Sequence, residues 1–372
     1  MEKNEIIRAY GSDCKAITKH VLEAAELEAE LLEKMEGMGI DRTDLRIGIK
    51  PNVLGRCPAE FGATTHTGIV AGIIEYLQER GFSGISVLEG SWVGDKTAEA
   101  YELLGWNALA KEYGVELTDN QKEKGFEADC SGLKLNICES FNRVDYLINV
   151  PVLKGHCQTK MTCALKNMKG MLPNSEKRRF HSMGLHRPIA HLNTYIHQDF
   201  IVVDHICGDP DFEEGGNPLV RNCVMAAKDP VLTDAFGASL LGYKPYDVEY
   251  IRLAEELGVG SADLSELKVI TVEGEGFEDM PRSRKILEVN YAVADVDSCS
   301  ACYGMLIGAL NRLKDEGTPY NSEEKICIGQ GYRGKTGKFG IGSCTAKFDF
   351  NVPGCPPEEE EIYRALKMQN SK

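Results

Sequence analysis

The sequence predicts an α/β protein whose sheet is mainly parallel. Short apolar, β-branched segments alternate with longer segments that carry apolar residues at helical spacing. Most of the helical segments run into a glycine, the usual residue after a helix carboxyl end. Strands that alternate with helices of this length are typical of parallel sheets with helical crossovers.

The first half of the chain supplies the elements that begin this alternation. A Ser cap opens the first helix, a Pro-Asn turn ends the first strand, and Gly81 closes the second helix. In order, we expect a helix over residues 12–37, a strand over 45–54, a helix over 65–81, a strand over 85–90 and a helix over 96–114.

The alternation resumes after residue 145 and ends near residue 285. Asp229, directly before Pro230, is the expected cap of the first helix in this part. We expect strands over 145–153, 200–206 and 222–229 and helices over 229–242 and 248–258. Beyond a charged loop, "EGFEDMPRSRK", the chain becomes rich in Cys and Gly. This change predicts a core domain over 1–285, which holds a substrate cleft, and a second domain over 286–372.

Charge and composition exclude several classes of partner. The formal net charge of −15 argues against nucleic acid, which needs a basic surface, and against an anionic membrane. No apolar run approaches the roughly 18 residues that a spanning helix needs, and the amino terminus lacks a secretory pattern. We therefore expect a cytoplasmic protein, in which the 13 Cys are free thiols or metal ligands rather than disulfides.

Four cysteines near the carboxyl end have the spacing of metal ligands. Cys299 and Cys302 form a C-x-x-C pair at a predicted strand-to-helix turn, and Cys344 and Cys355 follow in separate loops. The pair alone also fits zinc or a redox dithiol. The wide separation of the second pair disfavours a zinc ribbon. Thiolates gathered from a turn, a loop and a Pro-rich corner suit a [4Fe–4S] cluster.

The segments "CSACYGMLIGAL", "GSC" and "VPGCPPEEEEIYRAL" resemble the proximal-cluster site of nickel–iron hydrogenase small subunits and the related subunit of respiratory complex I. The resemblance implies a flavodoxin-like fold with Cys299, Cys302, Cys344 and Cys355 as ligands of one [4Fe–4S] cluster. Ser343 replaces the usual Thr of that family, which removes no ligand. Cys327, in "KICIGQG", is expected to be a strand thiol instead.

The core domain contains four further motifs, "KPNVL", "VDYLINVPVLKGH", "TCALKNMKGMLP" and "DPVLTDAFGASLLG". Together they resemble a second family, the iron–sulfur centre proteins that carry domain of unknown function 362. No activity is assigned to that family, so the resemblance implies an iron–sulfur link but names no reaction.

A candidate catalytic site follows the strand predicted over 145–153. His156 lies just beyond its carboxyl end, where ligands of open α/β sheets bind. A helix is expected over 159–171, with an amino end near Gln158 and Thr159 that could receive an anion. Lys166 on that helix and the later His181 complete a set suited to a general base and a charged anchor. At least half of four nearby basic side chains are expected to form a solvated face: Lys169, Lys177, Arg178 and Arg179.

The spacing of His156, Lys166 and His181 is also similar to that in nickel-pincer lactate racemases, which have a His, a cofactor-bearing Lys and a nickel-ligating His. Those racemases have a further catalytic His in an earlier loop. Here that loop, "LEGSW", offers Ser91 and Trp92, so two-base racemisation is not expected.

Two weaker groups of polar residues also follow predicted strands. Lys50 and Asn52 are expected to face the same cleft as His156. The acidic turn after residue 203 suits a divalent metal or substrate hydroxyls, or is simply a polar turn; its candidates are Asp204, His205, Asp209 and Asp211.

Taken together, these observations predict an anaerobe-type iron–sulfur oxidoreductase. It would pass electrons between a [4Fe–4S] cluster and a small-molecule substrate in the core cleft. Two alternatives remain: an isomerase or lyase with a structural or Lewis-acid cluster, and a non-catalytic electron carrier. The sequence also leaves open a redox partner protein and a homo-oligomeric state.

Overall fold

The computed structural model describes residues 1–276, 285–321 and 323–370. It divides into two compact units. The larger unit comprises Met1–Gly155, Met161–Pro210 and the described residues from Glu214 to 276. The smaller unit comprises His156–Lys160, Asp211–Glu213 and the described residues from 285 onward. The charged loop next to the predicted domain boundary lies largely outside the described residues.

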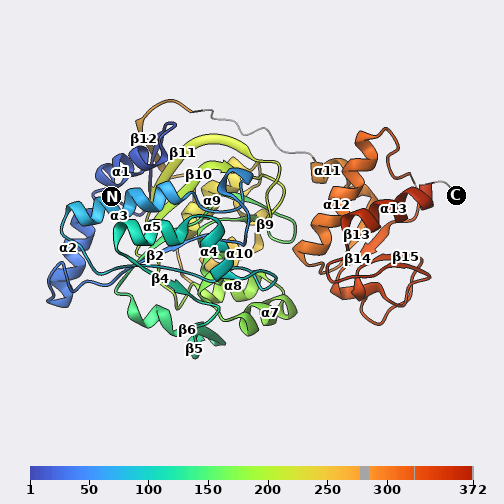
Figure 1. Ribbon diagram of the computed structural model, residues 1–372, viewed down its shortest axis with the longest axis horizontal. Coiled ribbons are helices and arrows are strands. Elements are labelled where there is room, and N and C mark those ends of the chain that lie inside the picture. The colour runs from blue at the N-terminus through green and yellow to red at the C-terminus, as the bar shows by residue number, and fades with distance from the viewer. Residues whose placement is uncertain (277–284, 322, 371–372) are drawn as a thin grey trace. The chain divides into compact units, whose positions relative to one another are not determined.

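The fold class is α/β, as the sequence predicts. In the larger unit an eight-stranded sheet has the order β12-β1-β11-β10-β7-β2-β3-β4. Figure 1 labels β12, β11, β10, β2 and β4 of this sheet. Its neighbours are parallel except where β11 pairs with β1 and with β10. The strands are β1 (Glu5–Tyr10), β2 (Ile47–Pro51), β3 (Ile85–Glu89), β4 (Glu116–Asp119), β7 (Tyr146–Val150), β10 (Phe200–Gly208), β11 (Leu219–Ala227) and β12 (Lys268–Glu273).

Helices cover both faces of this sheet, because alternate strand residues bury into two separate cores. Ile148 and Val202, for example, pack with α1 to α5, whereas Leu147 and Val203 pack with α6 to α10 and a hairpin of β5 and β6. The first group is α1 (Cys14–Ala24), α2 (Leu27–Met38), α3 (Thr67–Glu79), α4 (Thr97–Leu103) and α5 (Trp106–Tyr113). The second is β5 (Gly125–Cys130), β6 (Leu133–Cys138), α6 (Ala164–Asn167), α7 (Asn174–Met183), α8 (His186–Leu192), α9 (Pro230–Leu240) and α10 (Glu249–Glu256).

The smaller unit has its own four-stranded parallel sheet, and its strands follow one another in chain order, β13-β14-β15-β16. Apolar residues of its helices and strands form a third core. Its elements are α11 (Lys285–Val289), β13 (Val293–Asp295), α12 (Ser300–Asp315), β14 (Ile326–Ile328), β15 (Phe339–Ile341), β16 (Phe350–Val352) and α13 (Glu359–Asn370). Two three-residue strands, β8 (Lys154–His156) and β9 (Lys160–Thr162), pair only with each other.

None of the described helices is both long and apolar enough to cross a bilayer.

Candidate functional site

The loops that carry the four predicted ligand cysteines leave the same edge of the smaller sheet. Cys299 caps the amino end of α12 after β13, and Cys302 lies in the first turn of that helix. Cys344 lies in the turn after β15, and Cys355 follows β16. Because these strands are parallel, their carboxyl ends lie together, so the topology gathers cysteines from distant parts of the segment.

The four thiols change the pKa values of Cys299, of Cys302 and of the nearby Arg333. A hydrogen bond from Cys302 is the main reason that the pKa of Cys299 is lowered. The pKa of Cys302 is raised, first by that bond, then by burial and by the charges of Cys299, Cys355 and Cys344. Arg333 donates a hydrogen bond to Cys344, which raises the pKa of the guanidinium, and the charges of Cys355 and Cys299 act in the same direction. The charges of the four cysteine thiols and of the Arg333 guanidinium therefore act on one another.

Glycines near Cys344 and Cys355 adopt a backbone conformation that other residues rarely adopt. Gly342 has a φ of 85° and Gly354 a φ of 135°. A Cβ atom on Gly342 would lie 3.6 Å from the Cys302 sulfur.

Within the described parts of the chain, no three or more His, Cys, Asp or Glu side chains are grouped closely enough to hold an ion as they stand.

Cys327 lies within β14 and is half-buried. It is therefore a strand thiol, as the sequence predicts.

In the smaller unit, His156 is almost fully buried and both of its ring nitrogens have partners. The backbone N–H groups of Gln158 and Thr159 donate to Nδ1 at 3.1 and 3.0 Å. Nε2 lies 2.8 Å from a carboxylate oxygen of Glu213. This pattern assigns the proton to Nε2, which donates to Glu213. The ring is thus held in place by its neighbours.

Lys166 and His181 belong to the larger unit. Lys166 in α6 is 4% exposed, and its ammonium donates to the Thr162 hydroxyl at 3.0 Å. His181 is half-buried in the last turn of α7. The convergence of His156, Lys166 and His181 on one pocket stays a prediction.

The helix expected over 159–171 starts later than the sequence suggests. Residues 160–162 form β9, and α6 begins only at Ala164. Asp234, which is fully buried, accepts hydrogen bonds from the N–H groups of Ala164 and Leu165 at 2.7 and 3.3 Å. The anion site predicted near Gln158 and Thr159 is therefore wrong, because the helix amides lie elsewhere and already bind a carboxylate.

Lys50 is buried inside the larger unit, not exposed in a cleft as expected. Its ammonium forms an ion pair with Glu89 and donates to the Asn167 side-chain oxygen at 3.1 Å. Asn52 donates to the same oxygen at 2.9 Å. Burial lowers the pKa of Lys50, while the charge of Glu89 opposes that effect. The polar groups after β2 and β3 thus bind one another.

Lys177 extends this buried network, whereas the sequence suggested a solvated basic face. Its ammonium donates to the carbonyl oxygens of Gly90 and Ser91 at 2.7 and 2.8 Å. Burial is the main reason that its pKa is lowered to about 8. Arg178 and Arg179 are exposed and Lys169 is half-buried, so a solvated face for at least half of the four residues is confirmed.

A second buried ionic group joins His66 to the acidic turn. Asp204 is fully buried and accepts hydrogen bonds from the His66 backbone at 2.8 Å and from its Nδ1 at 2.9 Å. The sulfur of Cys207 lies 3.9 Å from Nε2. Burial alone would lower the pKa of His66, but the hydrogen bonds to Asp204 and Cys207 outweigh it and raise the pKa to about 11.

The remaining candidates of the acidic turn, His205, Asp209 and Asp211, are also buried. His205 is 4% exposed, and burial lowers its pKa to about 4. Asp209 accepts from the Asn217 N–H at 2.8 Å. Sequence reasoning did not select His66, because its partner Asp204 is 138 residues away and no local motif joins them.

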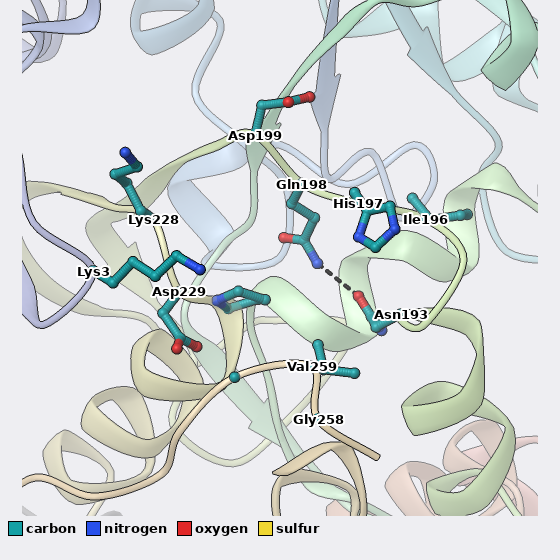
Figure 2. A pocket seen from close by; sticks show the side chains of 12 residues that line it. Lys3, Asn193, Ile196, His197, Gln198, Asp199, Lys228, Asp229, Gly258 and Val259 are labelled. Carbon is teal, nitrogen blue, oxygen red and sulfur yellow. Dashed lines mark hydrogen bonds between the residues drawn. The ribbon is translucent and has the colours of Figure 1, made fainter. Parts of the chain in front are cut away.

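One pocket of about 280 Å³ lies at the amino end of β10 (Figure 2). Three polar side chains on its wall bind other protein groups: Gln198 donates to Asn193 at 2.6 Å, Asp199 accepts from the Leu147 N–H, and Lys228 forms an ion pair with Glu30. Ligands of parallel sheets usually bind at the opposite, carboxyl edge.

Comparisons with known proteins agree with the core-domain motifs. The family described as Domain of unknown function (DUF362) matches residues 47–239, more than half of the chain. A curated protein of Synechocystis sp., "Thylakoid-associated protein sll1697", is 30% identical over 156 residues. That match covers 41% of this chain and 47% of the relative, so the chain spans about half the length of that protein.

Proposed function

The chain belongs to the DUF362 family, and from this membership and its cysteine-bearing unit we propose that it is an iron–sulfur oxidoreductase. A [4Fe–4S] cluster in the smaller unit would exchange electrons with a small substrate bound by the core domain. The observation that carries the proposal is the gathering of four cysteines, on three loops, at one edge of a parallel sheet.

The residues present fit a cluster in their chemistry. Cys299, Cys302, Cys344 and Cys355 would supply the thiolate ligands, and the lowered pKa of Cys299 favours the thiolate form that a ligand needs. When bound, the cluster supplies one-electron transfer. Arg333 would offset the negative charge of the thiolates, since it already donates to Cys344.

Lys166 and His181 of the larger unit are the proposed contacts for the substrate, and His156, which belongs to the smaller unit, is the proposed proton-transfer group. The buried Lys166 would orient an anionic group of the substrate. The Glu213 partner of His156 would stabilise a protonated imidazole.

A second candidate is a non-catalytic electron carrier. The observation in its favour is the partnered ring of His156, since a free general base would leave one nitrogen for its substrate. Reduction of the purified protein without turnover of any substrate would favour the carrier. A reaction that needs no electron donor would instead favour an isomerase or lyase.

The deciding experiment is anaerobic purification followed by analysis of iron, sulfide, zinc and nickel, with visible and electron paramagnetic resonance spectra. We expect about four irons per chain for one [4Fe–4S] cluster. Cys355→Ser should lower the iron content and bleach the visible absorption, while the matched variant Cys327→Ser should do neither. Stoichiometric zinc without iron would contradict the proposal.

A further inference from the structure

Three side chains of the larger unit form a constellation that the proposed electron transfer does not use. The ring of His66 lies between Asp204 and Cys207. Its Nδ1 is 2.9 Å from a carboxylate oxygen of Asp204, and its Nε2 is 3.9 Å from the sulfur of Cys207. A sulfur beside an imidazole that a third group orients is the arrangement that activates cysteine nucleophiles.

An irregularity in β10 brings Asp204 and Cys207 to the same histidine. The two residues are three positions apart, so strict alternation along a strand would turn them to opposite faces of the sheet. The pairing of β10 with β11 shifts register between His205 and Cys207, and such irregularities often re-aim a side chain beside a functional site. The contact between Cys207 and His66 is therefore a product of the local strand geometry.

The hydrogen bonds of His66 favour its protonated form. Asp204 is fully buried, and its carboxylate accepts from the backbone N–H as well as from Nδ1 of His66. Burial alone would lower the pKa of His66, but the hydrogen bonds to Asp204 and Cys207 raise it to about 11. At neutral pH the ring is therefore an imidazolium. A protonated imidazole next to a thiol stabilises the thiolate, which is the nucleophilic form.

Asp, His and Cys side chains also bind metal ions, but the geometry here differs from that of a metal site. Asp204 and Cys207 contact different nitrogens of one ring, so the imidazole separates them and the three donor atoms cannot meet at one ion. The arrangement suits proton transfer instead, because Nε2 lies beside the sulfur while Asp204 holds the other side of the ring.

The surroundings of the sulfur select a small reagent. Cys207 is 4% exposed, and its sulfur lies 3.2 Å from the carbonyl oxygen of Ala59. Ala59 and His66, which both contact the sulfur, line a cavity of about 440 Å³, whereas Cys207 itself does not line it. A reagent that reaches the sulfur must therefore be small, and it should be uncharged because burial penalises charge.

We propose that Cys207 is a site of oxidation by a small hydroperoxide, with His66 as the proton donor. The thiolate sulfur attacks one peroxide oxygen, and the O–O bond breaks. The leaving oxygen takes the proton from Nε2 of His66, so hydrogen peroxide yields a cysteine sulfenic acid and water, and the ring regains its proton from solvent. Every residue concerned lies in the larger unit, so the inference does not depend on the cluster.

The test treats the full-length protein with hydrogen peroxide in the presence of a metal chelator, which suppresses radical oxidation by released iron. Catalase stops the reaction, the protein is unfolded and alkylated, and peptide mass spectrometry measures the thiol that remains at each cysteine. We expect Cys207 to lose its thiol first and to gain one oxygen.

Two other cysteines of the larger unit are internal controls. Cys57 is half-buried, its thiol donates to the Glu214 carbonyl at 3.1 Å, and burial raises its pKa. Cys14 is half-buried and lines the cavity directly. If exposure alone decides, both lose their thiols before Cys207. Equal or faster loss at Cys57 or Cys14 would overturn the proposal.

His66→Gln assigns the reactivity to the imidazole. We expect it to slow the loss of the Cys207 thiol about a hundredfold, the lower end of what a positioned proton donor contributes. His191→Gln is the matched control and should leave that rate unchanged, since it removes a half-buried histidine whose Nδ1 donates to the Cys130 carbonyl at 2.8 Å. An unchanged rate in His66→Gln, or equal slowing in both variants, would overturn the proposal.

Circular dichroism checks that both variants fold. If His66→Gln does not fold, the order of oxidation in the wild-type protein still decides, because it requires Cys207 to react before the more exposed Cys57.

Discussion

At the scale of single residues, the ion pair between Lys50 and Glu89 is the clearest consequence of burying charge. Both side chains are almost fully buried, and removing one partner leaves the other charge without compensation. We expect Glu89→Gln to lower the free energy of unfolding by about 3–5 kcal/mol. Urea denaturation followed by circular dichroism measures this.

The exposed pair between Lys96 and Glu99 is the control for that experiment. Solvent screens charges at such positions, so Glu99→Gln should leave the urea midpoint unchanged. A loss in Glu89→Gln no larger than that in Glu99→Gln would show that Lys50 finds another partner or loses its proton at little cost.

Asp234 should make stability depend on pH. Burial is the main reason that its pKa is raised to about 7, against a reference value of 3.8. Between these values the folded state keeps a proton that the unfolded state releases, so stability falls as pH rises from about 4 to 7. The limiting slope for one proton is about 1.4 kcal/mol per pH unit.

The side chain of Asp234→Asn cannot titrate, so the stability of this variant should lack the pH dependence that Asp234 contributes. We expect the difference in unfolding free energy between wild type and variant to shrink steadily across that pH range, as measured by urea denaturation at each pH. A constant difference would mean that Asp234 is ionised throughout, held by the N–H groups of Ala164 and Leu165.

Arg333 should set the reduction potential of the proposed cluster. Reduction adds negative charge, and the guanidinium beside Cys344 favours that state. We expect Arg333→Ala to lower the potential and Arg333→Lys, which keeps the charge, to lower it less. A redox titration followed by electron paramagnetic resonance measures both. Identical potentials in all three proteins would exclude this coupling.

At the scale of elements, the short helical turn after α6 must approach the buried ion pair closely. A Cβ atom on Gly170 would overlap the Glu89 carboxylate and the Lys50 ammonium. Gly170→Ala should therefore destabilise the protein by about 3 kcal/mol, since it breaks a buried charge network.

Gly37, an exposed residue within α2 with open space around it, is the matched substitution. Gly37→Ala should stabilise the protein by about 0.5–1 kcal/mol, because alanine loses less backbone entropy in a helix. Thermal denaturation of both variants distinguishes the effects. Equal shifts would show that backbone entropy alone decides at Gly170.

Helices and strands with a clear period and a local end signal could be predicted from the sequence. Residues 67–79 and 85–89 form the expected helix and strand, and Asp229 caps α9 through the N–H groups of Val231 and Leu232. Apolar spacing does not reveal a break of one residue. The helix expected over 12–37 is interrupted where Glu26 adopts a φ of 55°.

Gly105, with a φ of 81°, divides the helix expected over 96–114. Other elements depend on contacts that sequence spacing does not encode. The start of α6 is set by Asp234, some seventy residues away, and the strand before it has only three residues. A short strand and a distant capping group leave no periodic signal to detect.

At the scale of the whole molecule, each unit has a hydrophobic core of its own. Both tryptophans, Trp92 and Trp106, belong to the larger unit. Tryptophan fluorescence therefore reports unfolding of the larger unit alone. We expect Cys355→Ser to lose iron yet to keep the midpoint of the fluorescence transition in urea. A shifted midpoint would mean that the two units unfold together.

Those parts of the candidate site whose residues are close in sequence could be proposed from the sequence. Cys299, Cys302, Cys344 and Cys355 lie within one segment and have the spacing of metal ligands, and their role as cluster ligands stays a prediction. The pairs Lys50–Glu89 and His66–Asp204 join strands and loops that are far apart in the chain, so only the folded sheet brings them together.

The position of β1 has a consequence for synthesis of the protein. Its two neighbours are β11 and β12, so residue 6 pairs with residue 269 and residue 7 with residue 226. At about 5–20 residues per second, a ribosome needs on the order of tens of seconds to deliver those partners. Until then β1 of the nascent chain has no neighbouring strand with which to pair. Since β1 lies between two strands, deleting Glu5–Tyr10 would open a gap within the finished sheet rather than shorten its edge.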